Sequence, residues 1–132
     1  MTQMKTITQQ QARELTATKI MGWVESEDGF WYEIPTKGMD CDHHIVFRQC
    51  SVVDWNPLAP EKLHQAFQML LAIKDTHYYD MCSDCLTLLN MDTACISCRI
   101  SHDNTPEGIC HAIVSAVLQA VDENNEQYEI ED

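Results

Sequence analysis

The residues of this 132-residue chain that are best suited to chemistry are its seven cysteines, because four of them form two C-x-x-C pairs. Cys82 and Cys85 make the first pair, and Cys95 and Cys98 follow after nine intervening residues. Four thiolates can give Zn²⁺ a closed tetrahedral site of the structural kind, so these residues are candidate metal ligands. The separation is shorter than the common spacing of about 15 to 20 residues, and neither pair is followed by glycine.

Strand geometry argues against a metal site shared by both pairs. Residues three apart in a regular strand point to opposite faces, so neither pair can chelate one ion unless the chain turns between its members. With a turn at residues 91 and 92, Cys85 lies opposite Cys98, and the other two cysteines lie opposite Ser101 and Leu88. We therefore expect cysteines that occupy sheet positions as small residues and a protein without a cofactor, with zinc as the alternative.

A second group of metal-binding residue types lies in a polar segment and comprises Cys41, Asp42, His43 and His44, with Cys50 nearby. Sequential neighbours rarely all bind one ion, and a polar loop that leads into a strand explains them adequately. No spacing orients a cysteine towards a histidine as nucleophile and base. The chain also has no G-x-x-x-x-G-K-[ST], G-x-G-x-x-G or G-x-S-x-G motif, so we expect no catalytic residues and no enzyme activity.

The charge balance narrows the class of partner. Eight Lys and Arg residues against 21 Asp and Glu residues give a net charge of −13, which repels phosphate backbones and attracts basic surfaces. We expect a protein partner with a basic surface and no direct nucleic-acid binding. The sequence lacks a run of about 18 apolar residues and a signal peptide at its start, which predicts a soluble, cytoplasmic protein without membrane contact.

Local signals predict the helices that must position these groups. The expected helices cover residues 9–21, 58–74 and 106–122. Thr8 and Gln11 form a capping box at the start of the first, and Gly22 supplies its end. Thr105 is the N-cap of the third, with Pro106 at the first helical position.

Aromatic and β-branched runs predict the strands. They cover residues 30–34, 45–47, 77–89 and 93–101, with a loop at 36–42 and a hairpin turn at 90–93. In the last strand Ala94, Ile96, Cys98 and Ile100 alternate with polar or small residues. This period of two predicts that all four side chains share one buried face.

The end of the chain differs from the rest in composition. Its last eleven residues contain six carboxylates and no basic side chain, so we expect an acidic mobile tail over 123–132 after a single domain over 1–122. The order of the expected elements predicts the α+β class. The specific expectation is a small α/β sandwich in which an antiparallel sheet of about three or four strands is covered by three helices.

Three stretches resemble a family of small bacteriophage and prophage accessory proteins with an α-β-α sandwich fold. They are ARELTATKIMGW, WNPLAPEKLHQAFQML and TPEGICHAIVSAVL, which cover about a third of the residues and span nearly the whole chain. The resemblance implies a phage accessory protein in the host cytoplasm and implies no catalytic set. The richness in cysteine and the acidic end are unlike the usual pattern of the family.

The charge and this resemblance together predict a non-enzymatic protein that binds and inhibits a host defence protein through an acidic surface, by mimicry of nucleic acid. A large aromatic beside acidic residues is the best candidate for an interface anchor. The expected partner-binding residues are Asp54, Trp55, Asp122, Glu123, Glu126 and Glu129.

Two alternatives stay open at the level of the sequence. The first is a small-ligand protein that sequesters a signalling nucleotide in a pocket between protomers, which is compatible with a homodimer and would need several of the eight basic side chains. The second is a structural phage module stabilised by zinc at Cys82, Cys85, Cys95 and Cys98.

Overall fold

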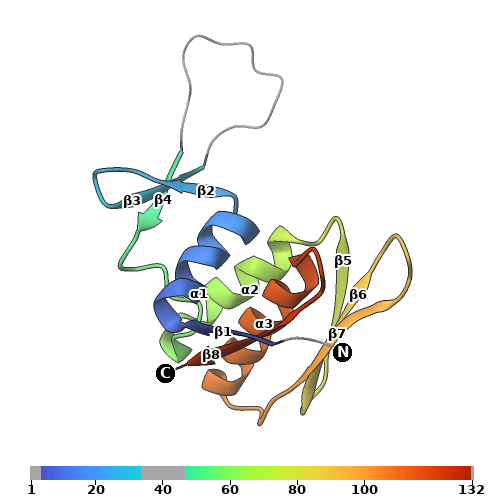
Figure 1. Ribbon diagram of the computed structural model, residues 1–132. Coiled ribbons are helices and arrows are strands. Elements are labelled where there is room, and N and C mark those ends of the chain that lie inside the picture. Colours follow the sequence, from blue (N-terminus) through green and yellow to red (C-terminus); the bar gives the residue numbers. More distant parts are fainter. Residues whose placement is uncertain (1–3, 34–46, 132) are drawn as a thin grey trace.

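A computed structural model describes residues 4–33 and 47–131 of the chain (Figure 1). The α-helices in these ranges are α1 (Gln9–Leu15), α2 (Leu63–Ala72) and α3 (Pro106–Val121). The strands are β1 (Met4–Thr8), β2 (Trp23–Glu25), β3 (Phe30–Glu33), β4 (Phe47–Ser51), β5 (His77–Met81), β6 (Cys85–Asn90), β7 (Ile96–Ser101) and β8 (Gln127–Glu131). The α+β class predicted from the sequence is confirmed.

The strands form small separate sheets instead of the one antiparallel sheet that we expected. Within the described ranges, β1 pairs with β8 in parallel, β2–β3–β4 form one antiparallel sheet and β5–β6–β7 form another. Figure 1 shows the helices in the centre of the molecule, with β2–β4 and β5–β7 on different sides of them. Each antiparallel sheet is a local meander, so its strands pair with chain neighbours and do not extend across the helical layer.

The first helix begins as its capping signals predict. The Thr8 hydroxyl accepts a hydrogen bond from the Gln11 backbone N–H at 3.1 Å, and the Gln11 side chain accepts one from the Thr8 N–H at 2.9 Å. The helix then widens into a π-helical turn, η1 (Thr16–Ile20). It ends at Gly22, whose φ of 72° lies in the left-handed region that favours glycine.

The other two helices differ in how well their starts were predicted. The second was expected from residue 58, but Pro60 disfavours helical backbone at Ala59, which is extended. A 3-10 turn, η2 (Pro60–Lys62), therefore precedes α2. The start of α3 is confirmed, because the Thr105 hydroxyl accepts a hydrogen bond from the Gly108 N–H at 3.0 Å.

The core surrounds α3 and includes Trp55, which we expected at the surface. The fully buried side chains include Ile113, Val114 and Val117 of α3 and Leu86 and Leu88 of β6. Trp55 is 1% exposed. Its indole N–H donates to the Thr16 hydroxyl at 3.0 Å, and its ring packs edge-on against Trp23 with centroids 4.8 Å apart. The π-helical turn supplies the polar partner that lets the indole be buried.

The segment expected as one strand over 77–89 is two strands, because the chain turns after Met81. The Cys82 N–H donates to the Cys85 carbonyl at 2.8 Å and closes this turn. The next turn is also longer than predicted, since the Asn90 N–H donates to the Cys95 carbonyl at 2.9 Å across four intervening residues. The predicted pairing of Cys85 with Cys98 is therefore wrong.

The register of β6 and β7 also corrects the expected buried face. Cys85 lies opposite Ser101, and Leu88 lies opposite Cys98. A β-bulge at Ser97 then brings Ile96 opposite Leu89, so Ile96 lies on the outer face and is 53% exposed. The bulge reverses the alternation on which the prediction rested.

The expected mobile tail is instead largely a strand. Residues Gln127–Glu131 form β8, which pairs with β1 in parallel although the two strands lie at opposite ends of the sequence. Tyr128 is 9% exposed and belongs to the core, with Ile130 packed against it. These alternating apolar residues give β8 a buried face, which the count of carboxylates alone did not reveal.

Some expectations fall on parts of the chain that the structure does not describe. The loop 36–42, most of the strand 45–47 and the group Cys41, Asp42, His43 and His44 lie outside the described residues, and β4 begins at Phe47. Among the described helices, none combines the length and apolar character that crossing a bilayer requires.

Candidate functional site

The two C-x-x-C pairs have different structures. Cys82 and Cys85 flank the turn between β5 and β6, where their thiols are hydrogen-bonded to each other, and this contact raises the pKa of Cys82. Cys95 is exposed at the opposite end of β6, and Cys98 is buried under α3. Within residues 4–33 and 47–131, no group of three or more Cys, His, Asp or Glu side chains is placed to hold a metal.

The buried thiols serve packing. The Cys98 thiol donates to the Ala116 carbonyl of α3 at 3.3 Å, and burial raises its pKa to about 12. The Cys110 thiol donates to the Ala59 carbonyl at 3.6 Å, and burial raises its pKa to about 11. Both thiols stay protonated at neutral pH, so neither is suited to nucleophilic or metal-binding chemistry.

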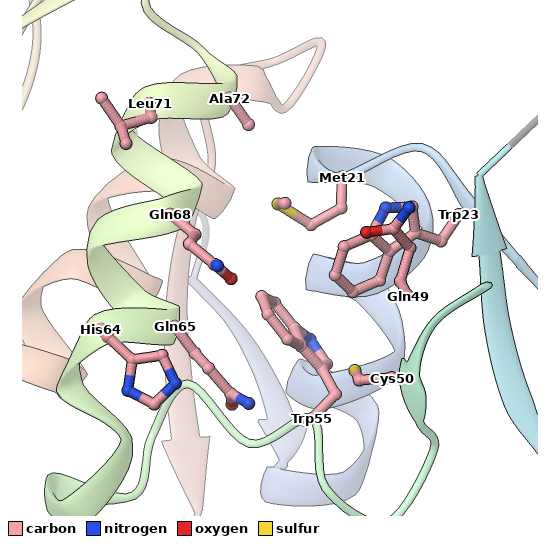
Figure 2. A pocket seen from close by; sticks show the side chains of 10 residues that line it. All are labelled: Met21, Trp23, Gln49, Cys50, Trp55, His64, Gln65, Gln68, Leu71 and Ala72. Carbon is pink, nitrogen blue, oxygen red and sulfur yellow. The ribbon is translucent and has the colours of Figure 1, made fainter. Parts of the chain in front are cut away.

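A pocket of about 470 Å³ lies between α2, the end of η1 and β4 (Figure 2). Figure 2 shows Trp55 between α2 and Trp23, with Gln68 and Met21 above it. The lining residues are Met21, Trp23, Gln49, Cys50, Trp55, His64, Gln65, Gln68, Leu71 and Ala72. The volume is within the usual range for small-molecule sites, and the described residues of the lining include no Lys, Arg, Asp or Glu.

The polar groups of this pocket are largely used inside the protein. The Gln65 amide accepts from the Asn56 N–H at 2.7 Å and donates to the Asp54 carbonyl at 3.0 Å. Burial raises the pKa of Cys50, which disfavours its thiolate, and no hydrogen bond between Cys50 and His64 is present in this described pocket. Within the part of the chain that the structure describes, the pocket therefore has neither an activated nucleophile nor a cation for a phosphate group.

Among the acidic candidates, Asp122 has a structural role. Its carboxylate accepts hydrogen bonds from Lys5 Nζ at 3.1 Å, the Tyr128 hydroxyl at 2.9 Å and the backbone N–H groups of Asn124 and Glu126 at 2.9 and 3.1 Å. The side chain is only 5% exposed. The Glu126 N–H bond is the largest of the contacts that hold the pKa of Asp122 far below its usual range. Asp122 therefore joins β1, α3 and β8 and is not available to a partner.

The other acidic candidates differ in accessibility. Glu126 is 17% exposed and lies 3.4 Å from Lys5 Nζ. Asp54 is 69% exposed, with Lys62 Nζ at 4.0 Å. Glu123 and Glu129 are exposed. The structure thus leaves Asp54, Glu123 and Glu129 accessible, and it removes Trp55 and Asp122 from the surface.

The strand β8 adds Glu131 to the acidic residues that the sequence predicted at the partner surface. Glu129 and Glu131 are exposed and lie opposite Thr6 and Thr8 of β1. Thr6, Thr8, Glu129 and Glu131 form the exposed face of the β1–β8 pair, and Glu123 lies in the segment between α3 and β8. We call these five residues together the acidic ribbon. The alternation of Tyr128 and Ile130 with glutamates was the signal in the sequence for this strand and its outward carboxylates.

Most basic side chains of the described chain are held by intramolecular contacts. Arg13 donates to the carbonyls of Trp55, Val52 and Val53 at 2.9 to 3.2 Å. Lys5 and Lys62 form the ion pairs given above. Arg48 stacks over the Phe30 ring at 4.7 Å, and Arg99 donates to the Thr87 hydroxyl at 3.2 Å. Exposed carboxylates such as those of the acidic ribbon are therefore left largely without cationic partners.

Comparison with known proteins adds no relative. No protein-family model matches the chain, and no curated protein and no solved structure shows significant similarity to it. The resemblance to phage accessory proteins accordingly stays a prediction from the sequence.

Proposed function

We propose that this protein is a non-enzymatic binding protein whose acidic ribbon engages a basic surface of another protein. The observation that carries the proposal is the placement of Glu129 and Glu131 on the exposed side of β8, while the nearby cation Lys5 is occupied by Asp122 and Glu126. A net charge of −13 adds a long-range field that attracts a basic partner.

The ribbon is held in a fixed geometry, which favours a defined partner over diffuse charge attraction. Outward residues of a strand are spaced about 7 Å apart, so Glu129 and Glu131 present a regular row of charge. Asp122 and Tyr128 fasten the strand to α3 at one end, and its pairing with β1 continues to Thr8, the N-cap of α1. A preorganised row of carboxylates loses less conformational entropy on binding than a mobile tail would.

The resemblance of the sequence to phage accessory proteins extends this proposal to a biological setting. In that setting the partner is a host defence protein, and the acidic ribbon occupies the groove in which that protein binds nucleic acid. Competition of this kind requires carboxylates that face a basic groove, and it predicts binding that weakens steeply as salt rises.

Sequestering of a nucleotide is less well supported by the described contacts. The pocket of Figure 2 has no basic side chain among its described lining residues. A second cavity, of about 430 Å³, contains Lys5 and Lys19 but also Asp122 and Glu123. Phosphate groups placed there would face two carboxylates, and Lys5 is already paired with one of them.

The proposal is tested with two variants that lose the same charge at different places. The ribbon variant carries Glu123→Gln, Glu129→Gln and Glu131→Gln, and a control variant carries Glu14→Gln, Glu25→Gln and Glu27→Gln at exposed positions of α1 and the β2–β3 hairpin. Each immobilised protein is exposed to bacterial lysate at about 50 and 300 mM salt, and the retained proteins are quantified by mass spectrometry.

We expect the wild type and the control variant to retain the same basic protein at low salt and to release it at high salt. The ribbon variant should retain several-fold less of it. An equal loss in both variants would mean that only net charge matters and would contradict a specific role for the acidic ribbon.

A further inference from the structure

The outer face of the β5–β7 sheet carries a row of apolar side chains, of which the two outer ones are exposed and the central one is half-buried. Tyr78, Leu89 and Ile96 lie directly opposite one another on the three strands. Tyr78 is 63% exposed and Ile96 is 53% exposed. Ile96 belongs to this face because of the bulge at Ser97, whose carbonyl accepts a hydrogen bond from the Asn125 side chain at 2.9 Å. The row is therefore a fixed feature of the fold.

The neighbouring row on the same face is polar and carries one charge of each sign. Asp80 of β5, Thr87 of β6 and Arg99 of β7 lie opposite one another. Asp80 and Arg99 are exposed, and Thr87 between them accepts a hydrogen bond from Arg99. The face thus has a negative edge, a polar centre and a positive edge beside its apolar row.

We propose that this face binds a second copy of the same chain, packed face to face about a two-fold axis that runs parallel to β6. Such a rotation places β5 of one copy over β7 of the other and leaves each row facing itself. The apolar row then covers the apolar row, and Asp80 of each copy faces Arg99 of its partner. One surface is therefore complementary to itself, as a two-fold symmetric interface requires.

The same properties argue for a second copy over another kind of partner. A basic partner would meet Arg99, and an acidic partner would meet Asp80, whereas only a face with the same arrangement satisfies both charges and covers the apolar row. Face-to-face sheets lie about 10 Å apart, which leaves room for Tyr78, Leu89 and Ile96 to interdigitate. A three-stranded face is small for an interface, so we expect a dimer of micromolar affinity.

Charge reversal gives a test that distinguishes this interface from misfolding. Asp80→Arg leaves the face with two positive edges, and Arg99→Asp leaves it with two negative edges. We expect each variant alone to dimerise at least about tenfold more weakly than the wild type, because like charges then face each other. A mixture of the two variants should form heterodimers of near wild-type affinity, because every edge again meets its opposite.

The measurement is sedimentation equilibrium of the full chain from about 5 to 500 µM at about 150 mM salt, which screens the repulsion between two acidic molecules. Glu25→Arg, at an exposed position of β2, is the matched control and should dimerise like the wild type or better. Ile96→Glu, which should abolish dimerisation, provides a second variant if either charge reversal fails to fold.

Two results would overturn the proposal. A wild type that stays monomeric up to the highest concentration would show that the face does not bind a second copy. A dimer whose affinity is unchanged by Ile96→Glu and by both charge reversals would place the contact elsewhere on the molecule. Neither result bears on the acidic ribbon, because none of its residues belongs to this face.

Discussion

The β1–β8 pair and the β5–β7 sheet both contact α3 with one face and expose the other, but their exposed faces differ in chemistry. The acidic ribbon carries threonines and glutamates, whereas the β5–β7 face carries an apolar row and one charge of each sign. Two copies of the ribbon repel each other and attract a basic surface, while two copies of the sheet face attract each other. The two proposals therefore assign binding of a basic protein to the acidic ribbon and binding of a second copy to the β5–β7 face.

The position of the acidic ribbon depends on one carboxylate, that of Asp122, which accepts hydrogen bonds from β1, β8 and the segment between α3 and β8. Replacing Asp122 by Ala removes the acceptor for Lys5, Tyr128 and two backbone N–H groups. We expect the free energy of unfolding in urea to fall by about 2 to 4 kcal/mol. Glu123→Ala, at the exposed neighbouring position, should change it by less than about 0.5 kcal/mol. Equal effects of the two substitutions would show that Asp122 does not hold β8 in place.

The Asp122 carboxylate should also make the free energy of unfolding depend on pH in the acid range. Hydrogen bonds hold the pKa of Asp122 far below its usual range in the folded protein. The contribution of this carboxylate to the free energy of unfolding is therefore fully present above about pH 4, near the ordinary pKa of Asp. It is lost as the pH falls further. Urea unfolding between pH 7 and pH 2 should show a smaller loss for Asp122→Asn than for the wild type. Parallel curves for the two proteins would contradict this.

The inner and outer positions of the β5–β7 region can be compared with a pair of cysteine substitutions. Cys98→Ser places a hydroxyl in the apolar contact with α3, and we expect a loss of about 1 to 2 kcal/mol of unfolding free energy. Cys95→Ser, at an exposed turn, should cost less than about 0.5 kcal/mol. Loss of folded protein with both variants would indicate that the two thiols share a role, such as a metal, that the described contacts do not contain.

The smallest expected effect is the difference in how the two surfaces respond to salt. Raising salt from about 50 to 200 mM should strengthen self-association a few-fold, because it screens the repulsion between two chains of net charge −13. The same change should weaken capture of a basic partner by the acidic ribbon. Sedimentation and capture at matched salt concentrations would measure both, and equal directions of change would remove the distinction between the surfaces.

The parts of the fold that could be predicted from the sequence are those fixed by local contacts. Thr8 with Gln11, and Thr105 before Pro106, satisfy backbone groups within their own helical turn, so the starts of α1 and α3 were predicted correctly. The pairing of β1 with β8 joins strands at opposite ends of the chain, and no local signal indicates it. The bulge at Ser97 was missed because a period of two assumes an uninterrupted strand.

For the charged and aromatic residues of the candidate site, the sequence did not predict which side chains are buried. Composition identified the acidic end of the chain, but it could not distinguish Asp122, which is enclosed by donors, from Glu129, which is exposed. Trp55 lies between two polar residues in the sequence, yet it is buried in the core, where its indole N–H donates a hydrogen bond to the Thr16 hydroxyl. Burial depends on contacts between distant segments, and these contacts decide which residues of one type remain available to a partner.

The most direct test of the central claim is competition for the captured basic partner between this protein and a labelled double-stranded DNA fragment. The acidic ribbon predicts that the wild type and the Glu14, Glu25 and Glu27 control variant displace the DNA at similar concentrations. The variant with Glu123→Gln, Glu129→Gln and Glu131→Gln should require at least about tenfold more protein. Displacement that is equally efficient with all three proteins would contradict the proposed role of the acidic ribbon. A partner that binds the protein and the DNA together would contradict binding in the nucleic-acid groove.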